Sequence, residues 1–189
     1  SKDLTVGSTF DECEAVDLSN DTTPPKVAFG PNGDTKYKKN NSTIVIVTDN
    51  VQVDQDSLKY LWNTSTTAPS EASFSSSFEN NSSISTTAGV SGGYYLWVLA
   101  KDAKGNTTIQ NSNIFNLDNT GPAITVLGSN PVSIIVGSTY TDAGATALDN
   151  VDGDVTSSIQ TTSNVNPNVL GAYTVTYSVT DKVGNTSTS

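Results

Sequence analysis

The chain has 189 residues, enough for one large domain or two small ones, and only 34% of them are hydrophobic. It contains no His and no Arg, which removes imidazole catalysis, His-ligated zinc and the bidentate arginine fork from consideration. The net charge of −10 argues against nucleic acid as a partner. No apolar run approaches the ~20 residues of a membrane helix, so we expect no membrane insertion.

Residues 1–20 form an acidic N-terminal segment without a strong strand pattern. Residues 6–10 (VGSTF) echo residues 136–140 (VGSTY), so we interpret the segment as the remnant of a preceding module or as a flexible lead-in. It carries Cys13, the only cysteine, so no internal disulfide can form. A free Cys of this kind is more often buried than reactive.

Two recurrences divide the rest of the chain. Residues 21–27 (DTTPPKV) recur as residues 118–124 (DNTGPAI), in each case a Pro-containing linker that enters an apolar strand. Residues 92–106 match residues 171–185, and the second copy alternates apolar and polar side chains before an Asp-x-x-Gly-Asn turn. This alternation predicts a strand with one buried face, followed by a hairpin. The recurrences predict two modules, residues 21–118 and 119–189.

Shorter candidate strands lie between these repeats. They are residues 43–48, 58–62 and 109–116 in the first module, and residues 123–127, 133–136 and 159–162 in the second. Short strands separated by turn residues, without helical periodicity, predict an all-β protein made of two tandem immunoglobulin-like antiparallel β-sandwiches.

The second module resembles the bacterial surface Ig-like repeat family, which is related to hyalin-type repeats. The residues that carry this resemblance are 128–131 (GSNP), 136–145 (VGSTYTDAGA), 149–156 (DNVDGDVT), 171–173 (GAY) and 181–185 (DKVGN). The first module resembles another Ig-like module of large Gram-positive surface proteins, through residues 57–60 (SLKY), Trp62, residues 67–70 (TAPS) and residues 93–106.

The resemblance implies a spacer or adhesion segment that lies outside the cell, on a Gram-positive surface or in a secreted multimodular protein. Its expected partners are neighbouring modules and a cell-surface glycan or protein. An accessory region of a secreted glycosidase is the remaining alternative. We expect no enzymatic activity in this chain, because no acid/base arrangement of carboxylates is recognisable and small sandwiches lack a deep cleft.

One acidic loop is the sharpest chemical feature. Asp149, Asp152 and Asp154 surround a glycine, and converging Asp oxygens are the ligands that Ca²⁺ requires. Asp142 and Asp181 complete the predicted calcium site if their loops meet at the same end of the sandwich. The alternative is that these Asp side chains cap turns through backbone hydrogen bonds.

The junction between the modules, residues 118–122, is a second cation candidate. A metal held there with Asp102 or another loop acid would stiffen the array. The alternative is a plain short linker.

The first module also offers aromatic side chains. The tripeptide at residues 60–62 (YLW) recurs at residues 95–97, and we expect the central Leu61 and Leu96 to point inward. The flanking aromatic side chains then share one outer face, which predicts a platform for a sugar ring or a protein partner; they are Tyr60, Trp62, Tyr95 and Trp97. Alternatively, the Ser/Thr-rich excursion of residues 63–87 folds over this face, or the register differs and a Trp belongs to the core.

Overall fold

The computed structural model describes residues 19–189 and confirms the all-β fold class. The only helical pieces in this part of the chain are two short 3₁₀ turns, Glu71–Ser73 and Thr156–Ser158. No helix among the described residues is long and apolar enough to cross a membrane. Cys13 and most of the predicted N-terminal segment lie outside the described residues.

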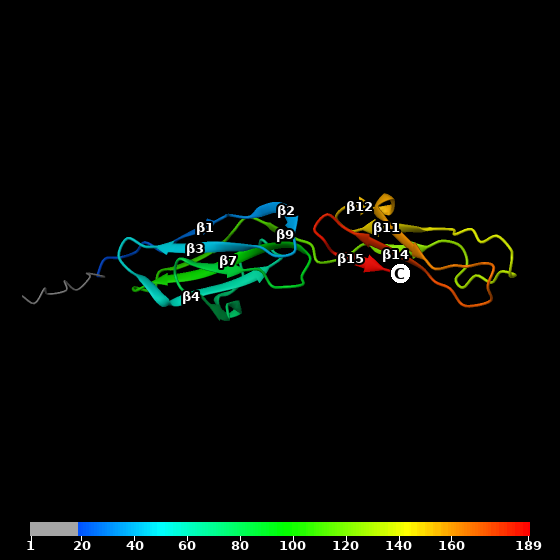
Figure 1. Ribbon diagram of the computed structural model, residues 1–189. Helices are drawn as coiled ribbons and strands as arrows, with labels where there is room; N and C mark the ends of the chain where they lie inside the picture. Colours follow the sequence, from blue (N-terminus) through cyan, green and yellow to red (C-terminus); the bar gives the residue numbers. More distant parts are fainter. Residues whose placement is uncertain (1–18) are drawn as a thin grey trace, which may run out of the picture.

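The strands fall into two groups that are placed end to end (Figure 1). The N-terminal unit contains one sheet in the order β1-β3-β6 and a second in the order β2-β9-β7-β4-β5, with β8 also paired to β7. Apart from the parallel β2–β9 pair, its strand pairings are antiparallel. Its strands are β1 (Lys26–Gly30), β2 (Asp34–Lys38), β3 (Ser42–Thr48), β4 (Val53–Asn63), β5 (Ser76–Ser77), β6 (Ser82–Ser85), β7 (Gly92–Asp102), β8 (Thr107–Asn111) and β9 (Phe115–Leu117).

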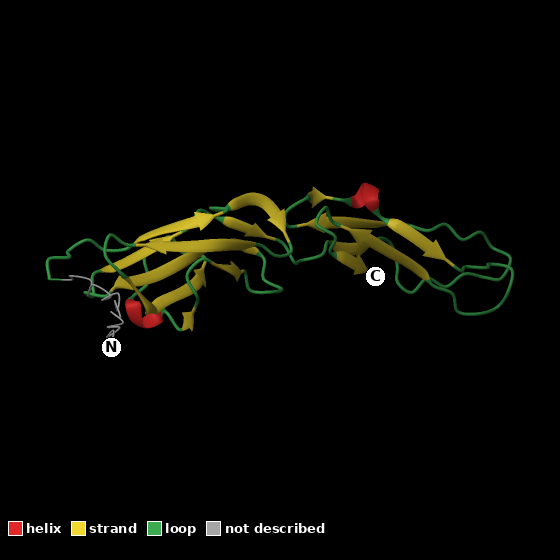
Figure 2. Cartoon of the chain, turned by 60° about the vertical axis from the view of Figure 1, so that its left-hand side comes forward, coloured by secondary structure: helices red, strands yellow, loops and turns green. Residues whose placement is uncertain are grey.

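The C-terminal unit contains two antiparallel three-stranded sheets, in the orders β10-β11-β12 and β13-β14-β15. Neither sheet includes a strand of the N-terminal unit, and Figure 2 shows the two groups of strands joined by a short loop. Its strands are β10 (Ala123–Val126), β11 (Ala145–Asp149), β12 (Gly153–Asp154), β13 (Gln160–Ser163), β14 (Val175–Thr180) and β15 (Thr186–Thr188).

The main core of the N-terminal unit lies between its two sheets. β3 (STIVIVT) buries every second residue, because its alternating pattern places Val45 and Val47 on the inner face. Opposite them, Leu96, Val98 and Ala100 of β7 are fully buried in the same cluster, which confirms the predicted inward face of that strand. Each fully buried Val or Leu contributes about 1.5–3 kcal/mol relative to an exposed one.

A second apolar cluster covers the outer face of β7. Phe74, Trp97 and Leu99 are buried together, with Leu61 and Tyr95 packed against them. Phe74 belongs to the excursion between β4 and β6, which therefore folds back over the sheet, as the alternative reading of the sequence predicted.

The far end of the C-terminal unit corrects one predicted strand. Residues 133–136 form no strand, and Ile135 there is 81% exposed. The end of this apolar run forms a turn over residues 135–138, which is closed by a hydrogen bond from the N–H of Ser138 to the Ile135 carbonyl (2.9 Å). An apolar run forms a strand only where another strand pairs with it, and here none does.

Candidate metal centres

Two clusters of three aspartates stand at equivalent places in the two units. In each cluster, one carboxylate oxygen from every member lies within 4.8 Å of the other two. The first member lies where the chain enters the unit, the second at the end of β3 or β11, and the third at the end of β7 or β14. Because these strand ends lie at the same end of the sandwich, residues far apart in sequence meet there. The clusters are Asp21, Asp49 and Asp102 in the N-terminal unit, and Asp118, Asp149 and Asp181 in the C-terminal unit.

The third aspartate of each cluster is fixed by the repeated Asp-x-x-Gly-Asn turn. Asp102 Oδ1 accepts the N–H of Asn106 (2.9 Å), and its Oδ2 accepts Asn106 Nδ2 (2.6 Å). Asp181 makes the same two bonds to Asn185, each at 2.7 Å. The glycine before each Asn has a positive φ, 93° at Gly105 and 90° at the equivalent glycine, which lets the chain turn back on the carboxylate.

The second aspartate caps the turn after its strand with one oxygen only. Asp49 Oδ2 accepts the N–H of Val51 (2.8 Å), and Asp149 Oδ1 accepts those of Val151 (2.9 Å) and Asp152 (2.8 Å). Turn capping therefore uses half of each carboxylate and leaves the other oxygen for the cluster.

The first aspartate repeats this arrangement. Asp21 Oδ1 accepts the N–H of Thr23 (3.0 Å), and Asp118 Oδ1 accepts the N–H of Thr120 (3.1 Å). Both side chains are buried, with exposed fractions of 8% for Asp21 and 1% for Asp118.

Each cluster consequently contains two buried carboxylate oxygens without a hydrogen-bond partner. These four are the only buried side-chain N or O atoms of the described residues that lack a partner: Asp21 Oδ2, Asp49 Oδ1, Asp118 Oδ2 and Asp149 Oδ2. Within residues 19–189, none of the three ion pairs includes a cluster residue.

Burial affects the pKa of two cluster aspartates, the entry residue Asp118 and the hairpin residue Asp102, with different outcomes. Burial raises the pKa of Asp118, and the negative charges of Asp149 and Asp181 raise it further. At Asp102 burial is the largest single influence and acts in the same direction, but the hydrogen bonds from Asn106, Lys104 and Gly105 together outweigh it and lower the pKa. Asp118 therefore lacks the donors that hold the Asp102 carboxylate in its charged form.

The structure brings together only two of the five calcium ligands expected from the sequence, Asp149 and Asp181. Asp152 instead accepts both the N–H (2.7 Å) and the Nζ (2.8 Å) of Lys182, which lowers its pKa. Asp154 is exposed and accepts the N–H of Thr156 (2.9 Å), as a turn cap does.

The fifth expected ligand, Asp142, accepts hydrogen bonds from the hydroxyl of Tyr177 and from the N–H of Gly144. The cation site expected at the junction, with Asp102 beside residues 118–122, does not form in that way. Asp102 belongs to the N-terminal cluster, and Asp118 belongs to the C-terminal one. Sequence reasoning did not single out Asp21 and Asp49 as ligands. The repeat of residues 21–27 in residues 118–124 is the signal that could have found Asp21.

The aromatic side chains do not share one face. In the β4–β7 register, Leu61 lies opposite Trp97 and Trp62 opposite Leu96, so Trp62 faces the main core. Tyr60 packs against that core as well, while Tyr95 and Trp97 belong to the outer cluster. The expected shared outer face is wrong for these two reasons: the register is shifted by one residue, and the excursion buries Trp97 to 4% exposure.

Comparison with known proteins adds one match. No curated protein matches the chain. Residues 124–189 match the family described as "Bacterial surface protein, Ig-like domain", which confirms the resemblance predicted for the second module. The C-terminal unit is therefore similar to an Ig-like domain of bacterial surface proteins, a class of module found at or outside the cell surface.

Proposed function

We propose that the chain is a non-catalytic spacer of an extracellular, multimodular bacterial surface protein, in which it holds neighbouring modules at a fixed orientation. The observation that carries the proposal is the linker between the two units, residues 118–122, because it is short and bonded to both of them. A spacer transmits orientation only if its linkers are held in this way.

On the N-terminal side, the linker is bonded through Asn119. Its Nδ2 donates to the carbonyls of Lys39 (2.8 Å) and Val90 (2.6 Å), and its N–H donates to Ser91 Oγ (2.8 Å). The hydroxyls of Ser91 and Thr120 also share a hydrogen bond (2.9 Å). The start of the linker therefore belongs to the surface of the N-terminal unit.

On the C-terminal side, the linker is packed into the other unit. Pro122 is fully buried, and a Cβ at Gly121 would lie 2.7 Å from Ser187 Oγ. Asn185 Nδ2 donates to the carbonyl of Asp118 (3.2 Å). A side chain at position 121 would have to displace the Ser187 hydroxyl, so this end of the linker is packed closely against β15.

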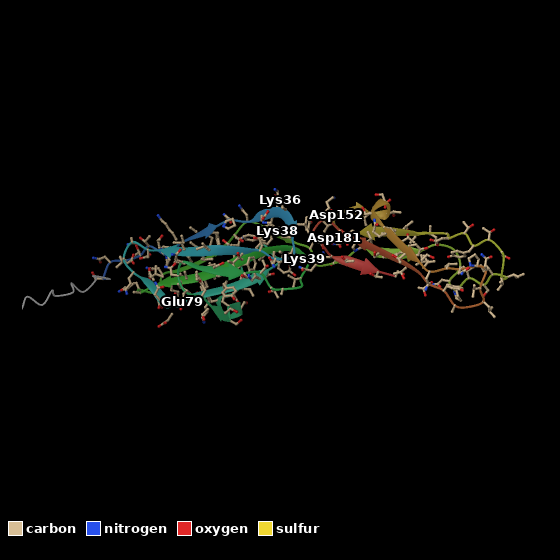
Figure 3. All side chains as sticks on the ribbon, viewed as in Figure 1. Lys36, Lys38, Lys39, Glu79, Asp152 and Asp181 are labelled. Atoms are coloured by element: carbon tan, nitrogen blue, oxygen red, sulfur yellow. The ribbon has the colours of Figure 1, made fainter. Side chains whose placement is uncertain are left out.

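The two units also interact directly. Lys39 Nζ donates to the carbonyl of Gly184 (2.6 Å), which joins the N-terminal unit to the Asp-x-x-Gly-Asn turn of the next. Figure 3 shows opposite charges on the two sides of the junction, with Lys36, Lys38 and Lys39 on one side and Asp152 and Asp181 on the other. Lys38 is paired with Asp34 and Asp152 with Lys182, each within its own unit, so these charges contribute less to the docking than the Lys39 hydrogen bond does.

The proposal is tested by measuring the distance distribution between spin labels, one in each unit. Labels at Gln55→Cys and Thr162→Cys, in a Cys13→Ser background, report on the orientation because both sites are exposed. We expect a narrow distribution that broadens in Asn119→Ala. Asn116→Ala, which removes a comparable side-chain bond within the N-terminal unit, should leave it narrow. A broad distribution without any linker substitution would contradict the spacer function.

A further inference from the structure

We propose that both aspartate clusters bind a hard divalent cation, Ca²⁺ in the first place, and that the ion at Asp118, Asp149 and Asp181 ties the two units together. This inference deepens the spacer function and rests on it only for the last step, the coupling of the units. Ion binding itself is argued from the clusters alone.

The first argument is the set of oxygens that turn capping does not use. Asp118 and Asp149 are 1% and 4% exposed, and each has one buried oxygen without a hydrogen-bond partner. A buried carboxylate oxygen with neither a donor nor a cation is strongly disfavoured. Here two such oxygens belong to one cluster of three carboxylates whose oxygens lie within 4.8 Å of one another, and this arrangement fits a shared cation.

The second argument is charge. Each cluster brings three carboxylates together, and no Lys of the described residues forms an ion pair with any of them. Lys39 and Lys182 lie near the C-terminal cluster, but their ammonium groups bind the Gly184 carbonyl and Asp152. A divalent cation would offset most of the repulsion between the three carboxylates.

The third argument is the kind of ligand. All three side chains in each cluster offer oxygen, and the chain contains no His that would favour zinc or copper. Oxygens that bind one Ca²⁺ at 2.3–2.6 Å lie at most about 5 Å apart, and the cluster oxygens meet this limit. Ca²⁺ also tolerates an irregular shell completed by water, whereas Mg²⁺ demands a regular octahedron.

The fourth argument is repetition. The two clusters share no residue, yet each leaves the same members, the entry aspartate and the strand-end aspartate, with a free oxygen. In both, the hairpin Asn donates to the carbonyl of the entry aspartate, at 3.2 Å from Asn106 to Asp21 and from Asn185 to Asp118. A chance group of turn caps would not reproduce this pattern twice.

The coupling of the units follows from where Asp118 stands. It comes directly after β9, and its N–H donates to the carbonyl of Lys38 in the N-terminal unit (2.9 Å). The other two ligands, Asp149 and Asp181, belong to the C-terminal unit. An ion bound by all three therefore bridges a residue fixed by one unit and two fixed by the other.

The test is the number of ions bound by the whole chain, measured by calorimetric titration with CaCl₂ after chelator treatment, with MgCl₂ in parallel. We expect two Ca²⁺ per chain, one in Asp149→Asn and one in Asp49→Asn. Asp154→Asn, an exposed acid of the same loop that lies outside the cluster, should still bind two. At a hundredfold excess over Kd, the melting temperature of each unit should rise by about 10–20 °C.

Absence of Ca²⁺ binding at millimolar concentration would overturn the proposal, and so would binding that survives Asp149→Asn and Asp49→Asn together. Each variant should fold, because Asn preserves the shape of the Asp side chain. Circular dichroism in chelator checks this. Binding of Mg²⁺ in preference to Ca²⁺ would contradict the assignment of the ion. Two bound ions with a broad spin-label distribution would refute the spacer function and leave the sites intact.

Discussion

The substitution Asp118→Asn has opposite expected effects with and without a cation. The Asp118 carboxylate is 1% exposed, and its cluster oxygen lies within 4.8 Å of those of Asp149 and Asp181. At an effective dielectric constant of about 20, two charges at this distance repel by ~3 kcal/mol. Asn removes the charge, and its Nδ2 can donate to the free oxygen of Asp149. Allowing for relaxation and partial protonation, we expect a gain of about 1–3 kcal/mol in chelator.

The assay is thermal unfolding of the whole chain by differential scanning calorimetry, first in chelator and then in excess Ca²⁺. For a unit of this size, the expected gain raises the melting temperature of the C-terminal unit by about 5–20 °C in chelator. In Ca²⁺ at a hundredfold excess over Kd, the wild-type sequence gains about 2.7 kcal/mol. The Asp118→Asn variant should gain far less. The difference between the two melting temperatures should therefore become smaller in Ca²⁺ or change sign.

The reasoning is refuted if Asp118→Asn melts below the wild-type sequence in chelator, because the cluster would then not be repulsive. It is also refuted if Ca²⁺ raises both melting temperatures equally. Asp154→Asn serves as the matched control, since it also removes one negative charge from the same unit but lies outside the cluster. It should respond to Ca²⁺ as the wild-type sequence does.

Three further outcomes are expected. Ile135→Lys should change the free energy of unfolding by no more than about 0.5 kcal/mol in urea titrations, because this side chain is 81% exposed; a larger loss would restore the strand over residues 133–136. Asp142 raises the pKa of Tyr177 to about 12, so the neutral phenol stabilises the fold below pH 10 and this contribution is lost as the pH rises through 12. Absorbance at 295 nm should show this late titration, and Asp142→Asn should return it toward pH 10. Phe74→Ala should cost about 3 kcal/mol and shift the emission of Trp97 to the red, because Phe74 covers it; an unchanged spectrum would contradict the closed outer face.

Much of the fold follows from local alternation. The inner face of β3 could be predicted from its own period-2 pattern, whereas β7 is apolar on both faces and its inner face could be predicted only by comparison with the alternating second copy, residues 171–185. The register between β4 and β7 could not be predicted in the same way. It places Leu61 opposite Trp97, and a shift of one residue exchanges the two faces of a strand. The aromatic platform was wrong for that reason.

The candidate site shows the same limit. The sequence concentrates acids in residues 149–154, and this density suggested one ion site there. Two of these acids have local structural roles instead: Asp152 pairs with Lys182, and Asp154 accepts the N–H of Thr156 in a turn. The aspartates that converge come from three separate segments of the chain, and they meet because the entry segment and two strand ends lie at the same end of the sandwich. Comparing the two repeats position by position is the sequence operation that anticipates this convergence.

The linker and the proposed ion must stabilise each other, because the same residue belongs to both. Asp118 is fixed from one side by its bond to Lys38 and from the other by the bond of Asn185 to its carbonyl. If the ion favours the docked orientation by some factor, the docked orientation favours the ion by the same factor. Loosening the linker with Asn119→Ala must therefore weaken Ca²⁺ at the C-terminal cluster and leave the cluster at Asp21 unchanged. If the proposed ion binds, the fraction of molecules in the docked orientation should rise with the calcium concentration, in addition to the hydrogen bonds that already hold the linker.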